Sequence, residues 1–396
     1  MNDAVNKKKK CLFIEKYSNV FLVTGPILTA YSFGGVSITF LMGIILVFLN
    51  FLYRKSMKLY IKTEYLPLII YVLLTCLLSF NGLLVLDNTK NLVNAIIGQI
   101  INIIFFLIAW DNTELKSIIK YADAVGGICC IFAIIQLVML LAGKEVPIGK
   151  IPFLKLETTW IPEIWGFRIN SVFSEPSYFA IFLLPIFTYH LIKHEWKKTV
   201  FFGMFVLLSS SSLGIISMTV ILLEQVTVAN IGIKNKSKII LGIISIVIGL
   251  GIILNASTGL GKMLNRTIEK IEEVFYEPKG GNTMRLKGYI EFYELLPMKE
   301  KLFGVGISQL RNYYLEHGYD LSNYSNSFVL TLINSGAVGF IILIIYLISL
   351  LTRAFKNNAI PFFILMFLVL LTDSILIGYR FYWICMYIYL TKKEEN

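Results

Sequence analysis

The chain has 396 residues, of which 56% are hydrophobic and only 15% are charged. Soluble domains carry about 25% charged residues, so this composition excludes a single water-facing domain and indicates a polytopic membrane protein. The formal net charge of +11 does not indicate nucleic-acid binding, because the lysines fall in short clusters between apolar runs, as in membrane topology. The five cysteines lack the spacing of a disulfide framework or a zinc site.

A spanning helix needs about 20 mostly apolar residues, and the chain contains a series of such runs. The clear candidates, in chain order, are 17–33, 35–53, 65–80, 92–110, 124–142, 173–192, 238–254, 327–351, 358–377 and 379–390. No small-residue cleavage site follows the first run, so we expect an uncleaved first span. The longer stretch 199–228 has four serines in its middle, and it is either one long helix or two short helices hinged at Ser209–Ser212.

Lysine and arginine clusters indicate how often 199–228 crosses the membrane, because short cytoplasmic loops are enriched in these residues. With the KKKK of the N-terminus inside, two crossings place every later basic cluster inside, whereas one crossing places the last three clusters outside. We therefore expect two crossings here and about 12 spans in all, with both termini cytoplasmic, in an all-α polytopic membrane protein.

This topology predicts four segments along the chain. They are an N-terminal transmembrane bundle (1–142), an outer loop followed by central helices (143–254), a large extracytoplasmic loop (255–326) and the C-terminal transmembrane helices (327–396). The large loop is the longest polar segment, and long loops in compact proteins usually carry function. Apolar residues at helical spacing predict a helix over 262–277, lying on the outer membrane surface, and another over 283–297.

The sequence RINSVFSEPSYFA (168–180) opens one of the spans at the outer face. In a structural interpretation, Ser174 caps the helix, Glu175 lies in its first turn and Pro176 favours that turn. In a functional interpretation, Glu175 accepts a proton from a hydroxyl and Arg168 binds phosphate with its bidentate fork. The sequence leaves both interpretations open, and Ser177 is a further substrate-binding candidate.

The large loop supplies a second set of candidates. Arg285 begins its second predicted helix, and Arg311 follows a GVG sequence at 304–306, whose glycines allow a tight turn or close approach to a ligand. Asn326 lies where the next span begins, so helix capping is the structural alternative for this residue. Arginines from two outer loops are suited to converge on one anionic headgroup.

Other residues have mainly structural interpretations. His317 is an ordinary loop histidine in this interpretation, and Ser209–Ser212 forms a hinge or packs against other helices. Gly336 and Gly339 within the following span indicate close helix packing. Asp373 is an exception, because it is acidic and lies inside a late predicted span, and a packing or cavity role for it stays open.

The order of these features resembles that of the bacterial O-antigen and capsule repeat-unit polymerases (Wzy-type), within the O-antigen ligase/polymerase superfamily. The resemblance covers about 165–345: an RxxxxFxEPxxxA signature, a serine-rich apolar segment, a large outer loop with an arginine and a GVG, and an asparagine before an LxxxGxxGF-type span. The matching residues are Arg168, Phe173, Glu175, Pro176, Ala180, Ser209–Ser212, Arg285, Gly304, Gly306, Asn326, Gly336 and Gly339.

The resemblance implies a metal-independent glycosyltransferase without a cofactor, with a GT-C-like helical fold, in the bacterial cytoplasmic membrane. It would work on the extracytoplasmic face and move the growing glycan from undecaprenyl diphosphate to the terminal sugar of an incoming lipid-linked repeat unit. Its partners would be these lipid-linked donor and acceptor oligosaccharides and the bilayer, together with a flippase and a chain-length regulator.

The resemblance also implies roles for single residues. The expected diphosphate- and substrate-binding residues are Arg168, Arg285, Arg311, Asn326, Gly304, Gly306 and Ser177. Arg168 and Arg285 would also stabilise the charge that develops on the leaving diphosphate. Glu175 would be the general base or would position the acceptor sugar.

Alternatives to this polymerase come from the same superfamily and from other classes. Related ligases, which move the glycan to another acceptor, carry a histidine immediately before the asparagine, and here that position is Ser325. A transporter of lipid-linked sugars would be expected to show repeats or ionisable residues at the membrane midplane, and we find no repeat. A non-enzymatic assembly factor is the remaining alternative.

Overall fold

The computed structural model describes residues 2–54, 62–84, 90–149, 151, 153–157, 168–227, 290–316 and 326–391, together with 235–237, 239–240, 265, 269, 272 and 276. Within these residues the chain is mostly α-helical and divides into two compact units. Unit 1 comprises 1–18, 43–113 and 274–396, and unit 2 comprises 19–42 and 114–273. These units cut across the four predicted segments, because both ends of the chain belong to unit 1.

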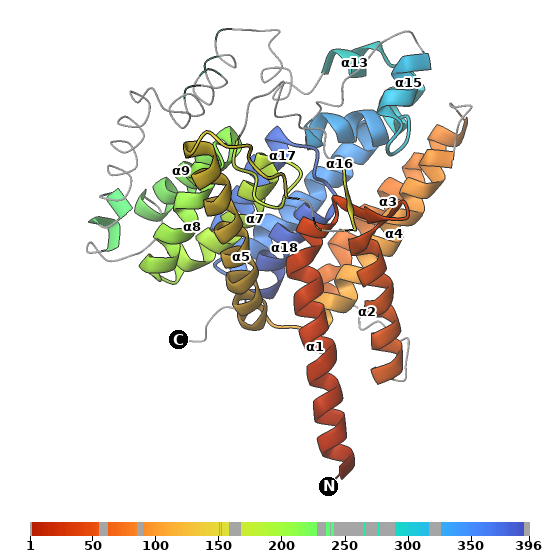
Figure 1. Ribbon diagram of the computed structural model, residues 1–396. Helices are drawn as coiled ribbons and strands as arrows, with labels where there is room; N and C mark the ends of the chain where they lie inside the picture. Colours follow the sequence, from red (N-terminus) through yellow and green to blue (C-terminus); the bar gives the residue numbers. More distant parts are fainter. Residues whose placement is uncertain are drawn as a thin grey trace. The chain divides into compact units, whose positions relative to one another are not determined.

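Unit 1 is built around the long helix α16 (Ser327–Lys356). Among the described helices that pack against it are α3 (Leu66–Ser79), α14 (Met298–Phe303), α17 (Ile360–Thr372) and α18 (Tyr379–Leu390). Figure 1 labels α3 in orange and α16, α17 and α18 in blue. Aromatic rings fill the core, and Tyr71 of α3 stacks on Tyr346 of α16 with ring centroids 5.2 Å apart. The unit also contains η1 (Thr63–Tyr65), η2 (Phe80–Leu84), α4 (Lys90–Asp111), α13 (Ile290–Leu295) and α15 (Leu310–Glu316).

Unit 2 contains a group of helices and a small sheet. The helices are α5 (Leu115–Leu141), α7 (Pro176–Ile192), α8 (Trp196–Leu208) and α9 (Ser212–Thr227). The antiparallel sheet has the order β2-β1-β3, from strands β1 (Tyr31–Phe33), β2 (Val36–Ser37) and β3 (Lys155–Leu156). Helices α1 (Asn2–Leu28) and α2 (Ile38–Arg54) contribute residues to both units.

The serine-rich stretch forms two helices, α8 and α9, and not one long helix. Ser210 has a left-handed φ of 49°, which no helix interior accommodates, so the chain breaks there. A Cβ built on Gly214 would lie 3.2 Å from Val206, and one built on Gly203 would lie 3.7 Å from Met218. At both positions, a residue of α9 thus lies beside a residue of α8 that is about equally far from the serines. The two helices are therefore antiparallel, and the chain reverses direction at the serines. The prediction of two hinged helices is confirmed.

Most of the other predicted spans correspond to helices with different ends. The first two predicted spans are wrong where they meet, because 31–33 and 36–37 form strands instead of helix. The span predicted over 358–377 ends at Thr372. Nearly all of the 238–254 span and the 262–277 helix lie outside the described residues, as does the 283–297 helix except its end, which is α13.

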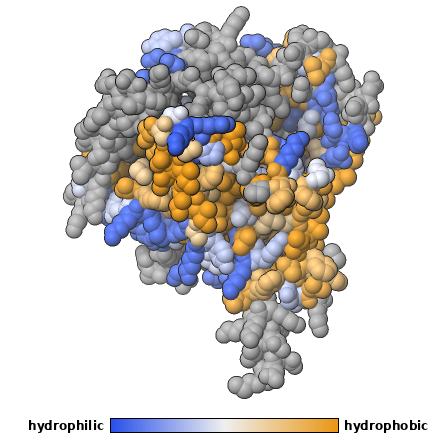
Figure 2. Space-filling model, viewed as in Figure 1, coloured by the Kyte–Doolittle hydropathy of each residue, from blue (hydrophilic) through white to orange (hydrophobic). Residues whose placement is uncertain are grey.

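Four described helical segments are long and apolar enough to cross a membrane: 63–84, 90–111, 115–141 and 327–356. Their apolar side chains are exposed in stripes, such as Ile341, Ile345 and Ile348 along α16, each at least 58% exposed. This spacing of three and four residues marks one helix face, which suits contact with lipid. Figure 2 shows apolar side chains over much of the visible surface. The fold is thus that of an all-α membrane protein.

Candidate functional site

Helix α7 begins within the RxxxxFxEP motif. Glu175 is its N-cap residue, with extended φ and ψ of −144° and 151°, and Pro176 is the first helical residue. The prediction that Ser174 caps this helix is wrong by one residue, because the fixed φ of proline suits the first helical position. The Glu175 carboxylate makes no capping hydrogen bond but accepts one from the Ser177 hydroxyl, over 3.2 Å.

Arg168 reaches the turn between α8 and α9. Its Nη1 donates a long hydrogen bond of 3.5 Å to the backbone carbonyl of Ser210, 42 residues later in the chain. Ala180 in the first turns of α7 also lies against α9, since a Cβ built on Gly214 would be 2.8 Å from the Ala180 Cβ. The motif and the serine turn, which the sequence offered as separate features, therefore form one structure in unit 2.

The loop between Arg168 and Glu175 is held by buried hydrogen bonds from Gln136 of α5. Gln136 Nε2 donates to the side-chain oxygen of Asn170 over 3.0 Å and to the carbonyl of Ser171 over 3.2 Å, and Gln136 Oε1 accepts from the Ser171 N–H over 2.8 Å. Sequence reasoning missed Gln136, although a glutamine within an apolar run is itself a signal, because a buried amide needs partners.

Two aromatic residues complete the support of this loop. The Tyr31 hydroxyl donates to the carbonyls of Val172, over 2.7 Å, and Gly149. Burial raises the pKa of Tyr31 to about 12, so the hydroxyl stays protonated and able to donate. Phe173 is buried and packs on Phe182 of α7, with ring centroids 5.3 Å apart. The apolar and amide side chains thus fix the loop, while Arg168 and Glu175 remain half-buried.

This end of unit 2 is chemically suited to an anion beside a hydroxyl group. Helices α7 and α9 both begin here, and helix N-termini carry unsatisfied N–H groups and a partial positive charge. Arg168 adds a guanidinium, which hydrogen-bonds phosphate oxygens through a planar fork. Glu175 adds a carboxylate able to accept a proton. The candidate site therefore consists of the Arg168 guanidinium and the Glu175 carboxylate, at the end of unit 2 where α7 and α9 begin. The loop that carries them is held in place by Gln136 and Tyr31.

In unit 1, the glycines of the GVG sequence (304–306) and Gly336 allow a short loop to bind to a break in α16. Gly336 has φ 66° and ψ −171°, so the helical hydrogen bonds are interrupted there. The carbonyls of Ile333 and Asn334 accept instead from the N–H groups of Val305 and Gly306, each over 2.9 Å. A Cβ on Gly304 would overlap the Asn334 backbone. These glycines thus have a structural role, and their contact with a ligand stays a prediction.

Gly336 interrupts α16 and also allows another helix to pack closely against it. A Cβ on Gly336 would overlap the backbone of Leu302 in α14. Gly339, by contrast, faces α3, since its Cβ would lie 3.4 Å from a methyl carbon of Leu78. Close helix packing is therefore confirmed for both glycines, Gly336 against α14 and Gly339 against α3.

Asn326 caps α16, as its structural interpretation predicted. Its side-chain oxygen accepts from the Val329 N–H over 2.9 Å, and the side chain is buried. Next to it, the Ser327 hydroxyl donates to the carbonyl of Asp373 over 2.6 Å. Asp373 is the C-cap residue of α17, so it lies at a helix end and not within a helix. Substrate contact by Asn326 stays a prediction.

Several predicted site residues cannot be placed against these. Arg285, His317 and Ser325 lie outside the described residues, and of Arg311 only its position in α15 is described. The convergence of arginines from two loops stays a prediction.

A charged cluster that sequence reasoning missed lies at the other end of α7. His190 is fully buried, and its Nε2 lies 2.6 Å from Asp123 of α5 while its Nδ1 lies 3.0 Å from Glu195. Lys198 of α8 joins both carboxylates, at 2.7 Å and 3.2 Å. His190 is 15 residues after Glu175, or about 22 Å along a helix. The cluster ties α5, α7 and α8 together away from the candidate site.

No protein-family model matches the chain, and no curated protein matches it.

Proposed function

We propose that the chain is a polysaccharide repeat-unit polymerase of the kind its motifs resemble. It would transfer the growing glycan from undecaprenyl diphosphate to the terminal sugar of an incoming lipid-linked unit, on the outer face of the membrane. The observation that carries the proposal is the Arg168–Ser210 contact, because it joins two separately matched motifs at the end where α7 and α9 begin.

In the proposed reaction, Arg168 binds the donor diphosphate and stabilises its negative charge as the glycosidic bond to it breaks. Arg285 is proposed to share this task. Glu175 takes the proton from the acceptor hydroxyl, whose oxygen forms the new bond. The rigid support by Gln136 and Tyr31 favours this assignment, because catalytic groups need fixed positions.

The test is a size profile of surface and lipid-linked glycans. Cells lacking the gene are complemented with wild type, Arg168→Ala, Arg168→Lys or Glu175→Gln. We expect a polymer ladder with wild type, and single repeat units in the deletion and with Arg168→Ala and Glu175→Gln. Arg168→Lys should restore short chains only, because lysine lacks the bidentate fork.

The matched control for Glu175→Gln is Glu114→Gln. Glu114 is also an N-cap glutamate without a capping hydrogen bond, at the start of α5 in the same unit, and it is exposed. Its variant should give the wild-type ladder. Polymer that accumulates on its lipid carrier without reaching a final acceptor would instead make the protein a ligase.

A second candidate, a transporter of lipid-linked sugars, is favoured by one observation. Helix α16 is broken at Gly336, and transporter binding sites are typically formed by discontinuous helices. Loss of a transporter would leave single lipid-linked repeat units on the inner face of the membrane. Loss of a polymerase would leave them on the outer face, where a membrane-impermeant glycosidase digests them in intact spheroplasts.

A further inference from the structure

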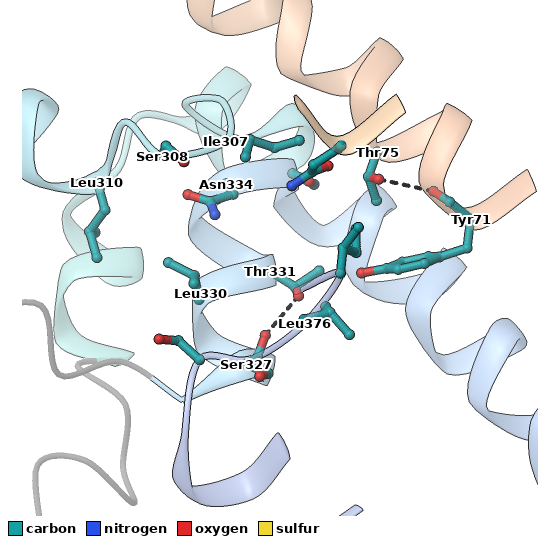
Figure 3. A pocket seen from close by; sticks show the side chains of 14 residues that line it. Tyr71, Thr75, Ile307, Ser308, Leu310, Ser327, Leu330, Thr331, Asn334 and Leu376 are labelled. Atoms are coloured by element: carbon teal, nitrogen blue, oxygen red, sulfur yellow. Dashed lines mark hydrogen bonds between the residues drawn. The ribbon is translucent and has the colours of Figure 1, made fainter. Parts of the chain in front are cut away.

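Unit 1 contains a cavity of about 280 Å³ between α3, α16, the residues after the GVG sequence and the connector from α17 to α18 (Figure 3). Ligand pockets start at about 300 Å³, so this one suits a single small group. Of the described residues that line it, none is charged, and all of the polar ones carry hydroxyls or amides: Tyr71, Thr75, Gln99, Ser308, Ser327, Thr331, Asn334, Ser335 and Ser374. The residues of the candidate site in unit 2 do not line this cavity.

The polar groups of this cavity are uncharged hydroxyls and amides, and several of the hydroxyls already donate their protons within the protein. The Thr75 hydroxyl donates to the Tyr71 carbonyl over 3.0 Å, and the Thr331 hydroxyl donates to the Ser327 carbonyl over 2.7 Å. A hydroxyl has one proton and two lone pairs, so both oxygens keep only acceptor capacity for a ligand. Among the described residues, Asn334 Oδ1 is buried without a hydrogen-bond partner. A buried acceptor left unpaired is costly, so a donor group from a ligand in this cavity would be stabilised there.

Backbone strain gathers at the same cavity. Ser308 and Ile377 both line it, and both have a left-handed φ of 61°. A β-branched residue in this region is a genuine outlier, and such strain persists where the surrounding structure fixes it, often at ligand-binding sites. The bonds from Val305 and Gly306 to the break in α16 hold the segment that carries Ser308. The walls of the cavity are therefore held in place by the surrounding fold.

We propose that this cavity binds one uncharged sugar residue, through sugar hydroxyls that donate to Thr75, Thr331 and Asn334. A phosphate or a carboxylate would be buried there without a cation to balance its charge, because none of the described lining residues is charged. A lipid chain would leave the Asn334 oxygen unpaired. The choice of a sugar over another neutral hydroxyl-bearing ligand rests on the proposed function.

The experiment is saturation-transfer NMR on the purified full-length protein in lipid nanodiscs, because maltoside detergents would themselves supply sugar. The probes are the methyl glycosides of glucose, galactose and N-acetylglucosamine, oligosaccharides released from the surface polysaccharide of the same cells, methyl glucuronide and inorganic diphosphate. We expect saturation transfer to at least one uncharged probe, and none to the glucuronide or the diphosphate.

Two variants test the residues. Thr331→Val and Asn334→Leu should each weaken sugar binding by about tenfold, the value of one or two hydrogen bonds. The matched control is Thr352→Val, because Thr352 makes the same kind of bond to the preceding turn of α16 but is exposed. Its binding should equal that of wild type. Asn334→Leu should leave the melting temperature unchanged or higher, since it removes an unpaired polar atom, whereas a merely structural asparagine would lower it.

The inference is overturned if no uncharged probe receives saturation, if the diphosphate competes with the sugar, or if both variants bind as wild type does. Sugar binding in a protein whose deletion leaves the polymer ladder intact would defeat the proposed function and leave this site standing. Loss of the polymer ladder on deletion, with no sugar binding to the purified protein, would support the proposed function and overturn this site.

Discussion

Replacing Gly336 by alanine should destabilise unit 1 more than any other glycine-to-alanine change at an α-helical position in it. Alanine at φ 66° and ψ −171°, a region essentially restricted to glycine, costs about 1–3 kcal/mol in backbone strain. Its Cβ would also overlap the Leu302 backbone, so α14 must move away from α16. That movement breaks the two bonds from Val305 and Gly306, each worth about 1 kcal/mol net. The expected loss is therefore about 4 kcal/mol.

The assay is thermal unfolding of the purified protein, followed by tryptophan fluorescence. For a unit of this size, 1 kcal/mol corresponds to about 2–4 °C, so the melting temperature should fall by about 10 °C. The control is Gly98→Ala in α4, where a Cβ would meet no atom within 4 Å. It should raise the melting temperature slightly, because alanine favours a helix. If Gly336→Ala melts within about 2 °C of wild type, the GVG loop does not stabilise the break in α16.

Three further predictions concern unit 2. Gln136→Leu should lower stability by about 2–3 kcal/mol in thermal unfolding, because it leaves buried groups of Asn170 and Ser171 unpaired; an unchanged melting temperature would contradict the role assigned to Gln136. His190→Phe should cost about 1–3 kcal/mol, since it removes the buried partner of two partly exposed carboxylates that keep Lys198; a double variant that also carries Asp123→Asn should recover part of the loss. Burial raises the Tyr31 pKa from its usual value of 10.0 to about 12, so its stabilisation is complete below about pH 10 and is lost as pH rises towards 12. Tyr31→Phe should therefore be less stable at neutral pH, and its melting temperature should fall less than that of wild type between pH 10 and 12.

Local sequence signals predicted much of the helical structure. Four consecutive serines within an apolar run predicted the hinge, because serine hydroxyls can bond nearby backbone groups in place of the helical ones. Here the Ser209 hydroxyl donates to the Val206 carbonyl over 2.6 Å, and the Ser211 hydroxyl accepts from the Gly214 N–H over 3.2 Å. The cap at Asn326 was predictable for the same reason. The N-cap at Glu175 was also within reach, since proline favours the position that follows the cap.

Features that depend on distant parts of the chain could not be predicted in this way. The break at Gly336 is stabilised by a loop some 30 residues earlier, and nothing in the local sequence indicates that α16 is interrupted. The polar lining of the unit 1 cavity comes from α3, α4, α16 and two connectors, which are far apart in the sequence. Likewise, the His190 cluster unites three helices whose charges are scattered along the sequence.

The most direct test of the proposed polymerase uses the purified protein in vesicles with a single lipid-linked repeat unit as the only substrate. The products are resolved by size after release from the lipid. The proposal predicts that the wild-type protein gives a ladder of two or more repeat units together with free undecaprenyl diphosphate. Both products should be absent with Glu175→Gln and present with Glu114→Gln. Repeat units that stay single with wild-type protein, or a Glu175→Gln ladder equal to that of wild type, would contradict it.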